Sequence, residues 1–86
     1  MAPLITGRQV RAARALLGWS QYKLADEAGI SVTPIARLER GVVDTKIGTL
    51  KVLMQTLEKA GIDFLSKKDG RMGVMVKPSE DHSSKE

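Results

Sequence analysis

The stretch that decides the fold is residues 21–40, QYKLADEAGISVTPIARLER, which reads as two short helices joined by a tight turn. Before the turn, Leu24 and Ala28 recur at helical spacing and predict one buried stripe. Ile35 and Leu38 repeat the pattern after the turn. Residues 21–40 therefore predict a helix-turn-helix.

Start and stop signals accompany both helices. Ser20 and Ser31 stand where a hydroxyl can accept a hydrogen bond from an unpaired amide in a first helical turn. Gly29 stands just past the end of the first of these helices, where a left-handed conformation favours glycine. Two capped helices with a glycine between them, on a basic chain, are typical of proteins that bind duplex DNA.

The positive charge lies in the part of the chain that holds these helices. The 86-residue chain has a net charge of +4. Residues 1–51 hold eight Lys and Arg against four acids, and residues 52–86 hold six of each, so the first part carries the whole excess. This distribution is expected of a surface that faces phosphates. A small domain can also reach this charge by chance.

The remaining composition narrows the class of protein. A chain of 86 residues suffices for one small domain. It has no cysteine, which excludes disulfides and thiolate metal sites, and no apolar run approaches the roughly 20 residues that cross a membrane. We therefore expect a soluble, cytoplasmic protein with no cofactor and no metal. The one histidine, His82, lies in a polar tail where solvent exposure is expected.

The quoted stretch also carries a family signature. LGWSQYKLADEAGIS followed by IARLERG resembles the XRE or Cro/C1-type helix-turn-helix repressor family over roughly residues 6–60. The signature is a Ser-Gln helix start, an internal Leu-Ala, a turn glycine and an Ile-x-x-Leu-Glu-x-Gly ending. Here these are Ser20-Gln21, Leu24-Ala25, Gly29 and residues 35–41. The resemblance implies a four-helix, lambda-repressor-like DNA-binding domain with an all-α core.

In that fold the helix over residues 32–40 would lie in the major groove with its first residues toward base edges. Arg37 follows Thr33 by four residues, on the same strip of the helix, and suits a bidentate contact with guanine. A phosphate or solvent contact of Arg37 is the alternative. Pro34 departs from the family pattern and would favour apolar contact with thymine methyl groups. The expected base-contacting residues are Val32, Thr33, Pro34 and Arg37.

Phosphate contacts are expected at the ends of the helices. Gln21 resembles the family's backbone-anchoring glutamine, and Ser20 stands beside it at the same helix start. Residues that follow the recognition helix also touch phosphate in the family, which implies this role for Arg40, Thr45 and Lys46.

A first helix is expected to begin after Thr6, because Thr6 and Gln9 form a T-x-x-Q capping box. Its core side is expected to comprise Val10, Ala13, Leu16 and Leu17. Arg8 and Arg11 would project outward, and Gly18 would end the helix.

Arg14 lies on the inner side of this first helix. In the family this position commonly pairs with the glutamate that matches Glu39, which implies a structural ion pair between Arg14 and Glu39. Two ordinary surface charges are the alternative.

A fourth helix is predicted over about residues 49–60, with Gly48 as its cap. Its core positions would be Leu50, Leu53, Met54 and Leu57. After Gly61 the apolar period changes from helical to alternating. Residues 62–65 and 73–76 therefore predict a β-hairpin that turns at Asp69-Gly70.

Ile62 and Phe64 can pack back on the helices, whereas Leu65 and Met75 would lie on the opposite face. This second apolar face and an open edge are expected to join two copies of the chain. The expected dimer interface comprises Ile62, Phe64, Leu65, Val74, Met75 and Val76. The fourth helix is the alternative interface. The chain would thus divide into a DNA-binding domain at 1–60, a hairpin at 61–77 and a disordered tail at 78–86.

These features predict a sequence-specific transcriptional regulator that binds double-stranded DNA at a palindromic operator as a homodimer and represses. An antitoxin, or another module that binds a partner protein and its own promoter, is the alternative. An enzyme is not expected, because the sequence offers no catalytic motif.

Overall fold

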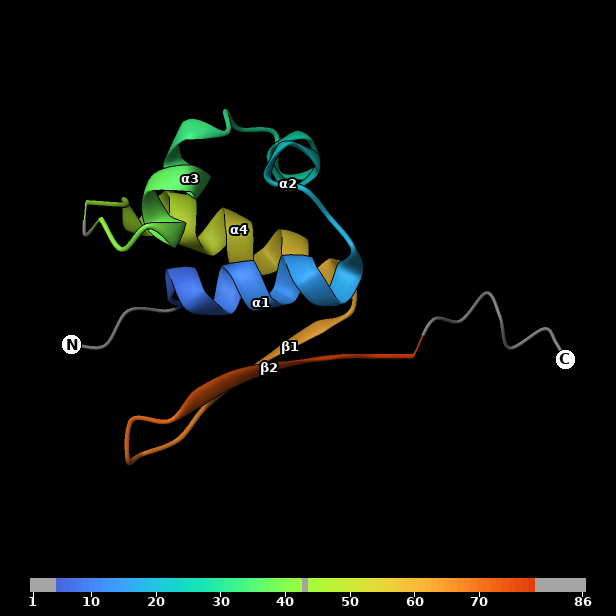
Figure 1. The fold of residues 1–86 in the computed structure, drawn as a ribbon, viewed down its shortest axis with the longest axis vertical. Coiled ribbons are helices and arrows are strands. Elements are labelled where there is room, and N and C mark those ends of the chain that lie inside the picture. Colours follow the sequence, from blue (N-terminus) through green and yellow to red (C-terminus); the bar gives the residue numbers. More distant parts are fainter. Residues whose placement is uncertain (1–4, 43, 79–86) are drawn as a thin grey trace, which may run out of the picture.

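The computed structural model describes residues 5–42 and 44–78, which form four helices and a β-hairpin (Figure 1). The elements in chain order are α1 Gly7–Leu17, α2 Gln21–Ala28, α3 Thr33–Glu39, α4 Ile47–Lys59, β1 Ile62–Ser66 and β2 Met72–Val76. α2 and α3 lie on one side of α1, and the hairpin lies on the opposite side (Figure 1). The predicted all-α core with a C-terminal β-hairpin is confirmed.

Local sequence signals set the ends of α1 and α2. The Thr6 hydroxyl accepts a hydrogen bond from the Gln9 amide, and the Gln9 side chain accepts one from the Thr6 amide, so the predicted capping box is present. The Ser20 hydroxyl accepts from an amide in the first turn of α2. Both helices end at glycines with left-handed dihedral angles, Gly18 and Gly29, at φ 70° and 71°.

The core lies where the helices and the hairpin meet. Its buried apolar side chains are Ile5, Val10, Ala13, Leu24, Ala25, Ile35, Leu50, Leu53, Leu57 and Ile62. Burying one such aliphatic side chain contributes about 1.5 to 3 kcal/mol. Because Ile62 of β1 stands in the same core as residues of all four helices, the hairpin is part of the folded unit.

α1 and α3 approach each other closely at the start of α1. A Cβ atom added to Gly7 would lie 2.0 Å from the Leu38 carbonyl oxygen and 2.9 Å from the Cα atom of Glu39. A side chain at position 7 would therefore push the two helices apart. Glycine here lets the first turn of α1 pack directly on the last turn of α3.

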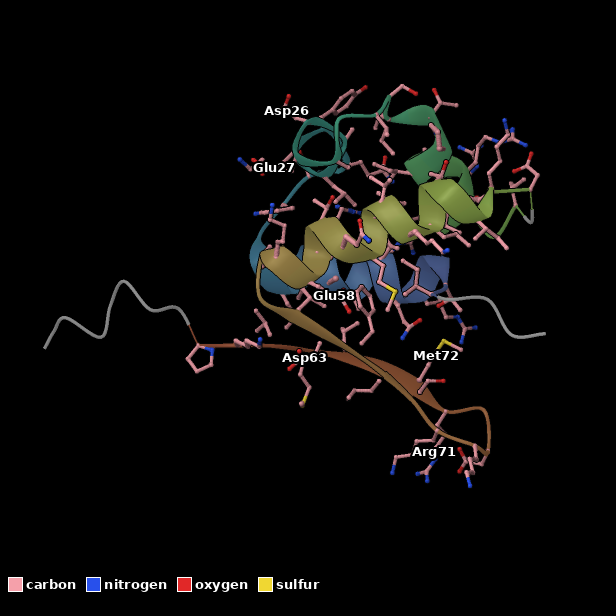
Figure 2. All side chains as sticks on the ribbon, turned by 180° about the vertical axis from the view of Figure 1, so that it is seen from behind. Asp26, Glu27, Glu58, Asp63, Arg71 and Met72 are labelled. Carbon is pink, nitrogen blue, oxygen red and sulfur yellow. The ribbon has the colours of Figure 1, made fainter. Side chains whose placement is uncertain are left out.

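β1 and β2 pair antiparallel, with Ile62 opposite Val76 and Phe64 opposite Val74. The predicted turn is present, since the Gly70 amide donates to the Lys67 carbonyl at 3.0 Å and Gly70 has a φ of 93°. The hairpin packs against α1 and α4, and Figure 2, which labels Glu58 on α4 and Asp63 on β1, shows it running below these two helices.

Gln9 fastens the hairpin to α1. Its Nε2 donates to the Leu65 carbonyl at 3.2 Å and to the Gly73 carbonyl at 3.1 Å, while its Oε1 accepts from the Thr6 amide at 3.0 Å. Gln9 is buried, and both ends of its amide are satisfied. The sequence identified Gln9 only as a capping residue, because its partners in the hairpin are more than 50 residues away along the chain.

α3 begins differently from the sequence prediction. Ser31 does not cap it: the residue before the helix is Val32, which has helical dihedral angles and no side-chain cap hydrogen bond. Pro34 stands in the first turn and has no amide hydrogen, which removes a usual donor to a serine cap at position 31. α3 therefore spans Thr33–Glu39 rather than residues 32–40.

Two other details of the prediction are wrong. α4 begins at Ile47, two residues early, because extended Lys46 precedes it and accepts the first helical hydrogen bond from Leu50. Gly48 therefore lies inside the first turn. Leu16 is 47% exposed, since the last turn of α1 directs Leu17 rather than Leu16 toward the core.

The predicted tail at 78–86 lies outside the described residues except for Pro78, and His82 lies outside them too. Within the described ranges, no helix has the length and apolar character that crossing a membrane requires.

Candidate nucleic-acid interface

The end of α3 is held by an ion pair with α1. Arg14 Nε donates to Glu39 Oε2 at 2.8 Å, and Arg14 Nη2 donates to Glu39 Oε1 at 2.7 Å, so the pair is bidentate. Arg14 Nη1 also donates to the Trp19 carbonyl at 2.9 Å. The Glu39 side chain is 1% exposed. The ion pair expected between Arg14 and Glu39 is present, and it fixes α3 against α1.

Two further side chains converge on Glu39. Gln21 Nε2, at the start of α2, donates to Glu39 Oε1 at 3.1 Å. Arg11 Nε lies 3.6 Å from the same oxygen, and Arg11 Nη2 donates to the Glu39 backbone carbonyl at 3.4 Å. Glu39 therefore joins α1, α2 and α3. The sequence predicted that Arg11 projects outward from α1, and its side chain is 64% exposed. The contact of Arg11 with α3 was not predicted.

Glu39 remains ionised although its side chain is buried. Burial by itself raises the pKa of the Glu39 carboxyl, but hydrogen bonds from Arg14 and Gln21 and the charges of Arg14 and Arg11 outweigh it. Together they hold the pKa below its ordinary value of 4.5. The hydrogen bond to Glu39 in turn raises the pKa of Arg14. The pair is therefore charged at neutral pH and serves to position the helices.

Thr33, Arg37 and Arg40 form an exposed strip along α3, named here the α3 strip. They follow one another at intervals of four and three residues, which places them on one side of the helix. Ile35 is fully buried on the opposite side. Thr33 and Arg40 are exposed and Arg37 is partly exposed, so the α3 strip offers donors and charge to an external partner.

Val32 and Pro34 contribute less to this surface than the sequence predicts. Val32 is half-buried and packs against the core, because it stands at the turn where α3 meets the rest of the domain. Only part of its side chain is therefore accessible to a base edge. Pro34 is half-buried in the first turn, next to Thr33 of the α3 strip.

Arg37 has an acidic partner in the loop that follows α3. Its Nη2 donates to Asp44 Oδ2. Both side chains are more than one third exposed, so the pair contributes little to stability. A guanidinium carries five N–H donors, and Asp44 is the only side-chain partner of Arg37 among the described residues, which leaves donors for another partner.

The start of α2 keeps donors for an anion. Ser20 is exposed, and its oxygen accepts the capping hydrogen bond, so its O–H hydrogen is free to donate. Gln21 has one of its two amide hydrogens on Glu39 and keeps the other. Both residues can therefore still act as the phosphate ligands that the sequence predicts.

The loop between α3 and α4 agrees only in part with the prediction. Thr45 Oγ1 is buried and has no hydrogen-bond partner among the described residues, so the loop turns this hydroxyl inward. The expected phosphate contact of the Thr45 hydroxyl is wrong for this conformation. Lys46 and Arg40, at the two ends of the loop, are exposed, and their phosphate contacts stay a prediction.

The hairpin residues divide between two faces. Ile62 is 1% exposed, so its expected role in a dimer interface is wrong, whereas Phe64 and Val74 are partly buried and pack against the domain's own core. They face inward because alternate residues of a strand point to opposite sides, and this side lies on α1 and α4. Leu65 and Met75, at 40% and 53% exposure, lie on the outer face. Val76 is also exposed, at the end of β2.

Comparison with known proteins agrees with this geometry. A family model described as Helix-turn-helix matches residues 10–64, from within α1 to β1. No curated protein matches the chain. The matched segment contains the α2–α3 pair, the α3 strip and the Glu39 ion pair. The chain therefore belongs to the XRE or Cro/C1-type helix-turn-helix family of DNA-binding regulators.

Proposed function

We propose that this regulator is a repressor that binds a palindromic operator as a homodimer, with α3 in the major groove of each half-site. The observation that carries the proposal is the α3 strip: Thr33, Arg37 and Arg40 have no part in the core, while the opposite side of α3 is packed and pinned through Glu39. A short helix held rigidly from behind presents its polar side with little loss of conformational freedom on binding.

Arg37 is the residue that would read a base. A guanidinium can donate two parallel hydrogen bonds to O6 and N7 of guanine, which discriminates by about 1 to 3 kcal/mol. Asp44 orients Arg37 in the free protein. On binding DNA, Arg37 Nη2 would either keep its hydrogen bond to Asp44 or exchange it for one to the guanine. Thr33, one turn earlier on the same strip, would contact the neighbouring base pair.

The remaining exposed donors would hold the backbone on either side of the groove. Ser20 and Gln21 stand at the start of α2, and Arg40 and Lys46 stand at the two ends of the loop after α3. Such contacts set the register of α3 and make binding depend on salt.

A dimer would form through the outer face of the hairpin. One recognition helix reads only a few base pairs, and two helices about 34 Å apart on one face of the duplex read a palindrome. Leu65 and Met75 supply exposed apolar surface on that face. Gln9 donates to the carbonyls of Leu65 and Gly73, which face each other between the strands, so it holds the hairpin from the side of α1 and leaves the outer face open to a partner.

Footprinting the DNA just upstream of the chain's own reading frame tests the function, since small regulators of this kind often bind there. The proposal expects two protected half-sites related by a two-fold axis. Protection of a single half-site at saturating protein would contradict the dimer, and no protection by a folded protein would contradict operator binding at this location.

Sedimentation of point variants tests the interface. Truncating the hairpin would remove Ile62 from the core, so Leu65→Ser and Met75→Ser are the better variants. We expect both to be monomeric and to lose tight operator binding. Ile47→Ser is the matched control, because Ile47 is 60% exposed at the start of α4. A monomer only in Ile47→Ser would move the interface to α4.

A further inference from the structure

A cationic groove lies where the start of α1 meets the end of α3. It has a volume of about 440 Å³, and the residues that line it are Thr6, Gly7, Arg8, Arg11, Leu38, Glu39, Arg40, Gly41 and Met72. The close packing of Gly7 on Leu38 and Glu39 forms its floor. Three arginines from two separate parts of the sequence therefore share one depression.

The charge that this cationic groove presents to a ligand is positive. Arg8 and Arg40 are exposed, and the Arg11 side chain is 64% exposed. Glu39 is the one acidic residue in the lining, but its side chain is 1% exposed and accepts from Arg14 and Gln21. Its charge is therefore directed into the protein, and the arginines face outward.

Arg11 is held loosely enough to take another partner. Its Nε stands 3.6 Å from Glu39 Oε1, and its Nη2 contacts the Glu39 carbonyl at 3.4 Å, both long for charge-assisted hydrogen bonds. Among the described residues, Arg8 and Arg40 form no ion pair. All three guanidinium groups can therefore donate to an anion.

The groove continues the α3 strip. Arg40 is the last residue of the strip and also lines the groove, so a duplex that lies along Thr33 and Arg37 would reach Arg8 and Arg11 next. The group that borders the major groove of a duplex is the phosphodiester backbone. Arginine forks suit phosphate oxygens, which accept several parallel hydrogen bonds.

We propose that the cationic groove binds a backbone phosphate of the operator, which makes α1 a third DNA-contacting element beside α2 and α3. The proposal rests on the proposed operator binding. It assigns Arg8 and Arg11 a role outside the helix-turn-helix.

Arg8→Ala and Arg11→Gln test the proposal in the full-length chain. Each lost phosphate contact lowers the slope of log affinity against log salt by about 0.9 and weakens operator binding by roughly threefold to tenfold near 0.15 M salt. Lys59→Ala is the matched control, because exposed Lys59 ends α4 beside Leu16 and Leu17, at the other end of α1. It removes the same charge and should leave the slope unchanged.

Phosphate ethylation interference then identifies the contact itself. On wild-type protein, ethylating one backbone phosphate per half-site should block binding through the groove, and Arg8→Ala should no longer be sensitive at that phosphate. Thermal melting checks that Arg11→Gln is folded, and Arg8→Ala decides the result if it is not. If Arg8→Ala binds more weakly but keeps the wild-type ethylation pattern, the arginine acts only by long-range electrostatic attraction, and the proposal is overturned.

Failure of this proposal can be told from failure of the proposed function. If wild-type protein protects an operator, and Arg8→Ala binds it with unchanged affinity and salt slope, the groove proposal alone is overturned. If folded wild-type protein prefers no DNA sequence, operator binding is overturned, and the groove proposal falls with it.

Discussion

Replacing Arg14 with Ala should destabilise the fold by an amount that depends on pH. In the wild-type protein the pKa of Glu39 is below its ordinary value, so the carboxylate contributes stability above pH 4.5 that is lost as the pH falls. Without Arg14, burial would dominate and raise the pKa of Glu39 above 4.5. The same carboxyl would then favour folding below pH 4.5 and oppose it as the pH rises.

The loss of stability in Arg14→Ala is limited, because Glu39 can be protonated instead of remaining charged without its partner. At pH 7 the buried carboxyl can take up a proton about 2.5 pH units above its ordinary pKa, which costs about 3.4 kcal/mol at 1.36 kcal/mol per unit. At pH 4.5 the same protonation costs only about 0.4 kcal/mol. Gln21 and Arg11 still favour the charged form, so about 3 kcal/mol is the upper limit of the pH-dependent part.

Urea unfolding followed by Trp19 fluorescence at pH 4.5 and pH 7 measures this difference. Arg8→Ala is the control: Arg8 is an exposed arginine on the same helix, and we expect less than about 0.5 kcal/mol at either pH. A loss in Arg14→Ala that is the same at both pH values would refute the reasoning. In addition, Arg14→Ala combined with Glu39→Ala should cost less than the sum of the single changes.

Other predictions test the packing of α1 and the surroundings of Arg37. Gly7→Ala should destabilise the fold by about 1 to 3 kcal/mol, because the added Cβ meets the α3 backbone. Gly48→Ala is the control: its Cβ would have nothing within 4 Å, and we expect it to stabilise α4 by about 0.5 to 1 kcal/mol. Equal shifts of the melting temperature in the two variants would contradict this. Gln9→Ala should cost about 1 to 2 kcal/mol and raise amide hydrogen exchange in the hairpin, because it removes the two hydrogen bonds that tie Leu65 and Gly73 to α1. Unchanged exchange would show that Gln9 does not hold the hairpin. Asp44→Asn removes the acid beside Arg37 and should raise affinity for random duplex DNA severalfold in fluorescence anisotropy at low salt, while Glu58→Gln on the exposed side of α4 should raise it less. Equal gains would show that only the net charge matters.

Much of the fold follows from local signals in the sequence. The Thr6–Gln9 capping box, the Ser20 cap and the two left-handed glycines each depend on residues within four positions of one another, so a sequence pattern contains the whole interaction. The hairpin turn at Asp69-Gly70 is equally local. The Arg14–Glu39 pair spans 25 residues, and only the family resemblance pointed to it.

The details that the sequence could not supply depend on contacts between distant segments. The inward turn of Thr45 depends on the path of a loop without a clear motif. The groove joins Arg8 and Arg11 to Arg40 through the packing of Gly7 on α3. In the sequence these arginines read as separate surface charges.

Guanine methylation interference tests the central claim, that α3 reads bases in the major groove, most directly. N7 of guanine lies in the major groove, and a bidentate arginine contacts it. We expect methylation of one guanine in each of two half-sites, about 10 base pairs apart, to block wild-type protein. Arg37→Ala should bind the same operator more weakly and lose sensitivity at that guanine while other positions still interfere. A wild-type protein that tolerates methylation of every guanine, or an Arg37→Ala variant with the unchanged pattern, would contradict base reading by Arg37.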